Sequence, residues 1–243
     1  MIFEPGKIPL KEETPVDPQG GLVQTWSYST LKNFEDCQHK VYLNKIVKVA
    51  SEQHPAALRG TEIHDLAEQY IKGELNTLPK ELNKFDKDFL TLQERYSEGT
   101  ATAEEPWGFD INWVPVDWMH PEVWCRMKLD AFVQESETSA VVIDFKTGRK
   151  EGNEISHISQ AQVYAIGALM RDPELEFIKI RFFYLDKGGE LQKEYTREYA
   201  LRLLPRWIQR AIALTSATDF LPMPSTFKCR FCNYNKECEW SAV

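Results

Sequence analysis

An apolar, β-prone run over residues 141–148 ends by presenting an acid and a lysine two residues apart, Asp144 and Lys146. Successive side chains of a strand point to opposite faces, so Asp144 and Lys146 share one face while Phe145 lies on the other. A carboxylate beside an ammonium group at a rigid strand end suits metal-assisted phosphodiester cleavage, because the carboxylate binds Mg²⁺ or Mn²⁺ and the ammonium offsets charge on the phosphate. Taken alone, the tripeptide is more often a solvated ion pair at a sheet edge.

The order of periodic segments predicts an α/β domain with a central mixed β-sheet flanked by helices. Helices are expected over residues 27–46, 59–71, 82–96, 156–170 and 198–218. Antiparallel hairpins are expected from strands 123–133 with 140–145 and from strands 177–185 with 191–196. The Trp-rich stretch 105–118 is β-prone; its tryptophans could stack on bases, but most are expected in the core. Residues 1–25 lack periodicity and predict a loose segment before a single domain over residues 26–243.

The length, net charge and apolar content of the chain limit the kinds of protein that it can be. The 243 residues are enough for one large domain with a full core. The net charge of −8 argues against a protein that coats nucleic acid through bulk electrostatics, although a local basic channel stays compatible with it. No apolar run approaches the ~18–20 residues that span a bilayer, and no signal-peptide pattern begins the chain, so we expect a cytoplasmic protein.

The five cysteines are unevenly spaced. Cys229, Cys232 and Cys238 form a Cys-x2-Cys-x5-Cys pattern, a spacing typical of metal ligands in a cytosolic chain, whereas three free thiols so close together are unusual. Cys37, on a predicted helix, is the natural candidate for a fourth ligand. Cys125 lies inside a predicted strand and is expected to be a small buried residue.

Three further features accompany the Asp-x-Lys strand. Asp130 lies on the strand expected to pair with that of Asp144, where a hairpin can bring two carboxylates within reach of one metal ion. His64 lies on the predicted helix 59–71, where a lone histidine is more often a satisfied surface or core residue. Gln160 and Tyr164 share one face of the helix after Lys146; they fit either an ordinary amphipathic helix or a pair that holds the lysine.

In this order the residues resemble the PD-(D/E)XK nucleases, specifically the RecB-like branch whose nuclease domain carries a cysteine-ligated [4Fe–4S] cluster. That branch includes the CRISPR-associated adaptation exonucleases, the AddB nuclease domain and the nuclease part of the eukaryotic replication helicase-nuclease. The resemblance covers residues 26–240, and the matching residues are Cys37, Gly60 with His64, Asp130, Asp144 with Lys146, Gln160 with Tyr164, and Cys229, Cys232 and Cys238.

The resemblance implies a role for each matching residue. A restriction-endonuclease-like core would bind Mg²⁺ or Mn²⁺ through His64, Asp130, Asp144 and the main-chain carbonyl of Phe145. Lys146 would position the attacking water, with Gln160 and Tyr164 supporting it. Cys37 and the C-terminal cysteines would hold a [4Fe–4S] cluster that joins the two ends of the chain. One departure is the stretch 126–129, Arg-Met-Lys-Leu, where relatives often have a Gly.

The implied activity is a metal-dependent DNA exonuclease acting mainly on single-stranded ends. Because the chain lacks a Gly-x4-Gly-Lys-(Ser/Thr) phosphate loop, it would be a stand-alone nuclease without a helicase motor, of the CRISPR-associated or phage-borne kind. Its partners would be DNA and possible recombination or CRISPR-adaptation proteins, with no membrane. The lysines and arginine near the cluster, Lys40, Lys45, Lys48, Lys228 and Arg230, fit either a basic path for DNA or a solvated face. A non-catalytic or zinc-stabilised nucleic-acid-binding protein of the same fold is the alternative.

Overall fold

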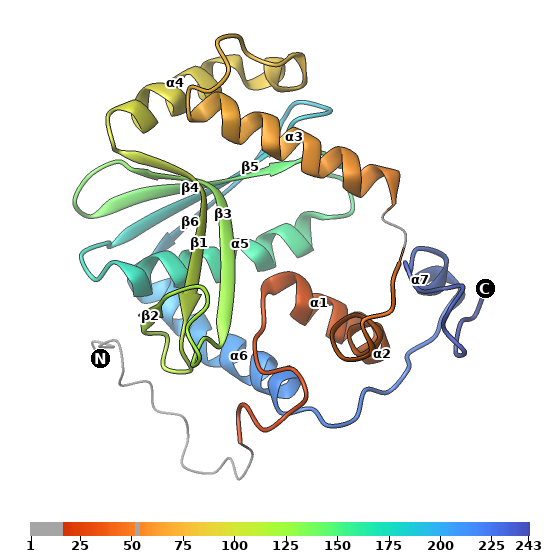
Figure 1. The fold of residues 1–243 in the computed structure, drawn as a ribbon. Helices are drawn as coiled ribbons and strands as arrows, with labels where there is room; N and C mark the ends of the chain where they lie inside the picture. The colour runs from red at the N-terminus through yellow and green to blue at the C-terminus, as the bar shows by residue number, and fades with distance from the viewer. Residues whose placement is uncertain (1–16, 52–53) are drawn as a thin grey trace.

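The computed structural model describes residues 17–51 and 54–243 and is built around one twisted six-stranded sheet (Figure 1). The strand order is β2-β1-β3-β4-β5-β6. Strands β4 and β5 are parallel and the other neighbours are antiparallel, so the predicted mixed sheet and both predicted hairpins are confirmed. The strands are β1 (Ala101–Phe109), β2 (Pro115–Val116), β3 (Cys125–Gln134), β4 (Ser139–Lys146), β5 (Phe177–Tyr184) and β6 (Glu190–Thr196).

Helices cover both faces of the sheet (Figure 1). One face packs against α3 (Pro55–Ile71), a 3₁₀ turn (Lys80–Phe85) and α4 (Asp86–Ser97), and the other against α5 (Glu154–Arg171), α6 (Arg197–Thr215) and α1 (Tyr28–Asp36). On β4, Ile143 and Phe145 belong to the core under α3 and α4, whereas Val142 belongs to the core under α5. Asp144 and Lys146 therefore face the α5 layer, as strand alternation predicts.

In the middle of β1 and of β3, the buried side chains switch from one face of the sheet to the other. On β1, Ala103 packs in the α3–α4 core but Trp107 packs in the α5–α6 core; on β3 the change falls between Leu129 and Ala131. The cross-strand register passes from Ala103 opposite Ala131 to Glu105 opposite Leu129, and the skipped Glu104 has φ 54°, in the left-handed region that a glutamate seldom occupies. This local distortion lies beside Asp130.

The prediction of a single helix over residues 27–46 is wrong, because the structure has separate shorter helical segments there. Ser27 caps α1 through its side chain, but the helix ends at Asp36 because Cys37 is extended, with φ −166° and ψ 110°. A short helix α2 (Gln38–Val41) and a π-helical turn (Tyr42–Val47) follow. Because of this break, the segment that contains α2 contacts the C-terminal segment that precedes α7 (Thr226–Arg230). The N–H of Leu221 donates to the Gln38 side chain at 3.0 Å.

Residues 20–22, which precede α1, lie along the C-terminal end of α6. The N–H groups of Gly21 and Leu22 donate to the carbonyls of Thr215 and Ala217 at 2.9 and 3.0 Å. A Cβ at Gly21 would lie 2.6 Å from the Thr215 oxygen, so this close approach needs glycine. The loose segment predicted for residues 1–25 lies, for residues 1–16, outside the described residues.

The remaining predicted elements agree with the structure to within a few residues. Trp107 and Trp113 are almost fully buried, which confirms the expectation that most of the tryptophans in 105–118 serve the core, while Trp118 is half-buried beneath the Arg126 guanidinium. Within residues 17–51 and 54–243, no helix has the length and apolarity that a bilayer crossing requires.

Candidate active site

Two carboxylates meet where the β3–β4 hairpin opens. The antiparallel ladder ends at Ala131 opposite Ile143, so Asp130 and Asp144 lie just beyond its last pair. There the Asp130 side chain replaces a ladder partner, because its Oδ2 accepts the N–H of Phe145 at 2.5 Å. Both carboxylates are buried, Asp130 at 8% and Asp144 at 3% exposure, which acids rarely are unless a partner group lies beside them.

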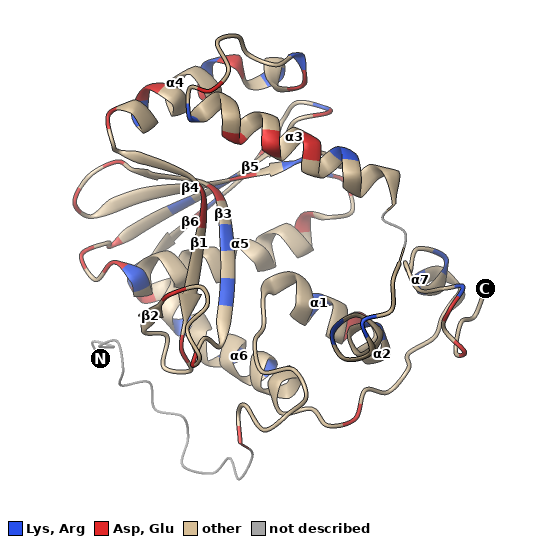
Figure 2. Ribbon diagram, in the orientation of Figure 1, with Lys and Arg blue, Asp and Glu red and all other residues tan. Residues whose placement is uncertain are grey.

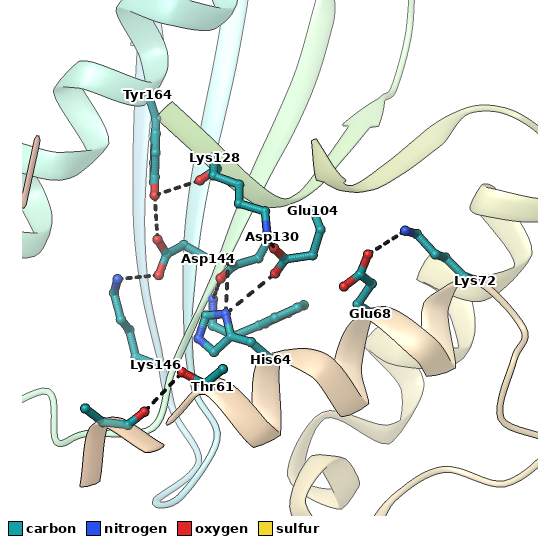
Figure 3. A network of polar contacts seen from close by, with 12 residues as sticks. Thr61, His64, Glu68, Lys72, Glu104, Lys128, Asp130, Asp144, Lys146 and Tyr164 are labelled. Carbon is teal, nitrogen blue, oxygen red and sulfur yellow. Dashed lines mark hydrogen bonds and ion pairs between the residues drawn. The ribbon is translucent and has the colours of Figure 1, made fainter. Parts of the chain in front are cut away.

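Lys146 of β4 and Tyr164 of α5 contact Asp144 (Figure 3), and so does Gln160, also of α5. The Lys146 ammonium lies 2.5 Å from Asp144 Oδ2 and donates to the Gln160 Oε1 at 3.0 Å. The Gln160 amide donates to Asp144 Oδ1 at 3.2 Å, and the Tyr164 hydroxyl donates to the same oxygen at 2.8 Å. Gln160 and Tyr164 thus hold both members of the Asp-x-Lys pair.

His64 reaches the site from α3, on the opposite side of the sheet (Figure 3). Its Nδ1 lies 3.2 Å from Asp130 Oδ1 and 3.8 Å from Glu104 Oε1. The structure therefore brings together the side chains predicted for the site, from two helices and two strands: His64, Asp130, Asp144, Lys146, Gln160 and Tyr164.

Glu104 is a site residue that sequence reasoning missed. Its left-handed backbone turns the carboxylate from β1 towards His64, and its other oxygen pairs with the Lys128 ammonium. Nothing in the local sequence signals this, because Glu104 lies in a β-prone stretch with no motif and a glutamate seldom adopts positive φ. Strained residues of this kind gather at functional sites.

The donor set fits a divalent cation. One ligand atom each from His64, Glu104 and Asp130 lie within 4.8 Å of one another. Asp144 does not belong to that group of atoms, but its Oδ2 is also buried and, despite its closeness to Lys146, accepts no hydrogen bond of good geometry from any residue the structure describes. Carboxylate oxygens with one imidazole suit Mg²⁺ or Mn²⁺. The ligand role of the Phe145 carbonyl stays a prediction.

Burial and the neighbouring charged groups shift the pKa values of the site residues. Burial alone would lower the pKa of His64, but hydrogen bonds to Asp130 and Glu104 raise it to about 10. Burial and the negative charge of Asp144 raise the pKa of Asp130 to about 6, although His64 and the Phe145 N–H oppose this. Burial and the two aspartates raise the pKa of Tyr164 well above its usual value, so its hydroxyl stays a donor. A cation between these carboxylates would relieve their repulsion.

The four cysteines predicted to act together line one cavity of about 290 Å³ at the meeting of the N- and C-terminal segments. The Met223 N–H donates to the Cys37 sulfur at 3.4 Å, and Lys228 donates to the Asp36 carbonyl at 2.8 Å. Within the described part of the chain, no three of these sulfur atoms lie within 4.8 Å of one another. Cys125 is fully buried in β3, away from this cavity, as predicted.

The sequence matches the family model of the PD-(D/E)XK nuclease superfamily over residues 25–239, which is most of the chain. The protein belongs to the PD-(D/E)XK nuclease superfamily. In this PD-(D/E)XK protein, the tripeptide Asp144-Phe145-Lys146 has the (D/E)-x-K spacing, and Asp130 precedes it in the sequence. The superfamily assignment made from the sequence is thereby confirmed.

Comparison with solved structures found SSO0001, a crystal structure that is 18% identical to this PD-(D/E)XK protein, with a TM-score of 0.49. The match covers 91% of this chain and 89% of that one. A comparison with curated proteins found no match.

Proposed function

We propose that this protein is a Mg²⁺- or Mn²⁺-dependent deoxyribonuclease that hydrolyses single-stranded DNA from its ends. The observation that carries the proposal is the convergence of Asp130, Asp144 and Lys146 at one open strand end. Ligand atoms of three side chains that suit a divalent cation lie within 4.8 Å of one another, and the Lys146 ammonium is held by Asp144 and Gln160. A structural ion pair would not need so many acids buried together, because each costs desolvation energy.

The side chains divide the chemistry among them. His64, Glu104, Asp130 and Asp144 would hold the cation, which when bound lowers the pKa of a coordinated water and withdraws charge from the phosphate. The Lys146 ammonium orients the attacking water and offsets charge on the pentavalent transition state. Tyr164 and Gln160 keep Asp144 and Lys146 in place through their hydrogen bonds, so they act on the reaction through those two residues.

The charge distribution supports a nucleic-acid substrate. Although the whole chain has a net charge of −8, residues 37–51 and 220–236 together contain six lysines or arginines and no acid. These two segments meet around α2 and α7, where parts of the ribbon are coloured blue for Lys and Arg (Figure 2). A local cationic surface on an acidic protein favours binding of a phosphate backbone at one place rather than everywhere.

Exposed aromatic rings support a single strand as the substrate. Phe227 and Phe231, on and just after α7, are 77% and 69% exposed, with their rings 5.7 Å apart. Lys228 and Arg230 lie between them in the sequence. Aromatic rings beside cations bind unpaired bases by stacking, which a duplex does not offer.

We also propose that Cys37, Cys229, Cys232 and Cys238 hold a [4Fe–4S] cluster. All four cysteines line one cavity, which supports a group that they share. Four thiolates suit an iron–sulfur cluster and also a zinc ion, so iron content and visible absorbance distinguish the two. The role of the cluster would be to join the α1–α2 segment to the C-terminal segment. The sequence resemblance adds recombination or CRISPR-adaptation proteins as proposed partners, which co-purification would test.

The test is a comparison of DNA forms. End-labelled linear single strands, the same strands circularised, and blunt duplexes are incubated with Mn²⁺ or Mg²⁺. The proposal predicts progressive shortening of linear single strands, little cleavage of circles, slower attack on duplexes and no reaction in a chelator. Cutting of circles as fast as linear strands would contradict action from ends. Binding of DNA without cleavage under every metal condition would support the non-catalytic alternative.

A further inference from the structure

His157 continues the active-site face of α5 by one turn. His157, Gln160 and Tyr164 follow one another at spacings of three and four residues, which places them in one stripe of the helix. Gln160 and Tyr164 reach Asp144 on β4, whereas His157 reaches the next strand, β5. Its Nδ1 lies 2.7 Å from the Tyr184 hydroxyl, and its ring stacks on Phe182 at 5.3 Å with an interplanar angle of 24°.

The same two β5 residues flank Lys146. Tyr184 is the register partner of Lys146 in the parallel β4–β5 pair, and Phe182 is the partner of Asp144. The Lys146 ammonium lies 5.4 Å from the centre of the Phe182 ring, on which the imidazole also stacks. His157 is therefore a neighbour of the catalytic lysine, although the mechanism above gives it no task.

The surroundings fix the protonation of this pair. Burial, followed by the charge of Lys146, lowers the pKa of His157 to about 4, and burial raises the pKa of Tyr184 to about 12. Near neutral pH the imidazole is therefore uncharged and the phenol keeps its proton, so one of the two groups donates to the other. In the arrangement in which the phenol donates to Nδ1, the imidazole proton resides on Nε2. Within residues 17–51 and 54–243, no group accepts a hydrogen bond from this Nε2.

We propose that the Nε2–H of the half-buried His157 donates a hydrogen bond to a phosphate oxygen of the DNA strand next to Lys146, and that Tyr184 acts as a positioning residue that holds the imidazole in this tautomer. The inference rests on the proposed nuclease function and adds a substrate contact to it. A neutral donor suits this place because a second cation beside Lys146 would repel it, while a hydrogen bond to a charged phosphate is among the stronger ones.

Two near-isosteric variants test which nitrogen matters. Asn places its amide near the position of Nδ1, whereas Gln places its amide near the position of Nε2. With linear single-stranded DNA and Mn²⁺, His157→Asn and His157→Ala should each lower kcat/KM by about ten- to a hundredfold, and His157→Gln should stay within about fivefold of wild type. Tyr184→Phe should lower it by about two- to tenfold, since the imidazole remains but its tautomer is no longer fixed.

A purely structural role predicts a different pattern. Thermal unfolding of the Asn and Gln variants should be similar, so a rate difference between them would not reflect lost folding. If Asn and Gln lose activity equally, or if His157→Ala cleaves at the wild-type rate, the inference is wrong. Absence of cleavage by the wild-type protein in any metal would instead refute the proposed function itself.

The tautomer can be measured without any nuclease activity. In ¹⁵N-histidine spectra of the wild-type protein at pH 7, the His157 signal, assigned among five histidines through the Asn variant, should show a protonated Nε2 and an unprotonated Nδ1. Tyr184→Phe should mix the two tautomers. An imidazolium signal, or a proton on Nδ1, would overturn the inference even if the enzyme cleaves DNA.

Discussion

Binding of Mn²⁺ should release one proton from the protein at pH 8, and that proton should come from His64. Burial opposes its protonation, but hydrogen bonds to Asp130 and Glu104 raise its pKa to about 10, so metal-free His64 is charged at pH 8. Asp130, with a pKa of about 6, is already ionised there and releases none. A metal ligand must lose its proton, so between pH 7 and pH 9 the apparent affinity for Mn²⁺ should rise about tenfold per pH unit, or ~1.4 kcal/mol.

Isothermal titration calorimetry measures this proton directly. At pH 8, the binding enthalpy of Mn²⁺ is recorded in two buffers of different ionisation enthalpy, and the slope gives the number of protons released. We expect a slope near one for the wild-type protein and near zero for His64→Gln. Below pH 6 the slope should increase, because Asp130 is then also protonated. A wild-type slope near zero at pH 8 would mean that His64 keeps its ion pair with Asp130 and is no metal ligand.

Three other outcomes follow from the site and the cysteine cavity. Lys146→Ala should abolish DNA cleavage without unfolding the protein, which parallel cleavage and circular-dichroism measurements would check; an active variant would remove the lysine from the mechanism. Glu104→Gln should weaken Mn²⁺ binding at least about tenfold by calorimetry, and an unchanged affinity would exclude Glu104 as a ligand. Cys232→Ala should lose iron and visible absorbance and expose the α1–α2 segment to protease. Cys125→Ala should retain both iron and absorbance and change stability by only ~1 kcal/mol, so equal loss of iron in the two variants would refute the assigned ligand set.

The helices and strands whose apolar residues recur at a regular spacing could be predicted from the sequence. The strands around Asp144 and those of the second hairpin alternate or are continuously apolar, and the helix bearing Gln160 has an amphipathic pattern, so their type and pairing followed from the side chains alone. The position of Asp144 and Lys146 on one face needed only the alternation of a strand.

Other parts depend on tertiary contacts that no local pattern encodes. Glu104 enters the site because β1 and β3 change face at the same level, a distortion that exists only once the strands pair. Nothing in the sequence around His157 indicates a role for it, because its contact with Tyr184 of β5 exists only in the folded protein. The predicted helix over residues 27–46 fails at Cys37 because contacts with the C-terminal segment, made across more than 180 residues, override helix propensity.

The most direct test of the central claim is the rate at which Asp144→Asn cleaves DNA. Asparagine retains an acceptor for Tyr164 and Gln160 but lacks the negative charge that a divalent cation requires. On end-labelled single-stranded DNA with Mn²⁺ in single-turnover conditions, the wild-type protein should degrade the strand. Asp144→Asn should leave it as intact as a protein-free control does. Cleavage by Asp144→Asn at close to the wild-type rate would contradict the assignment of this strand end as the catalytic metal site.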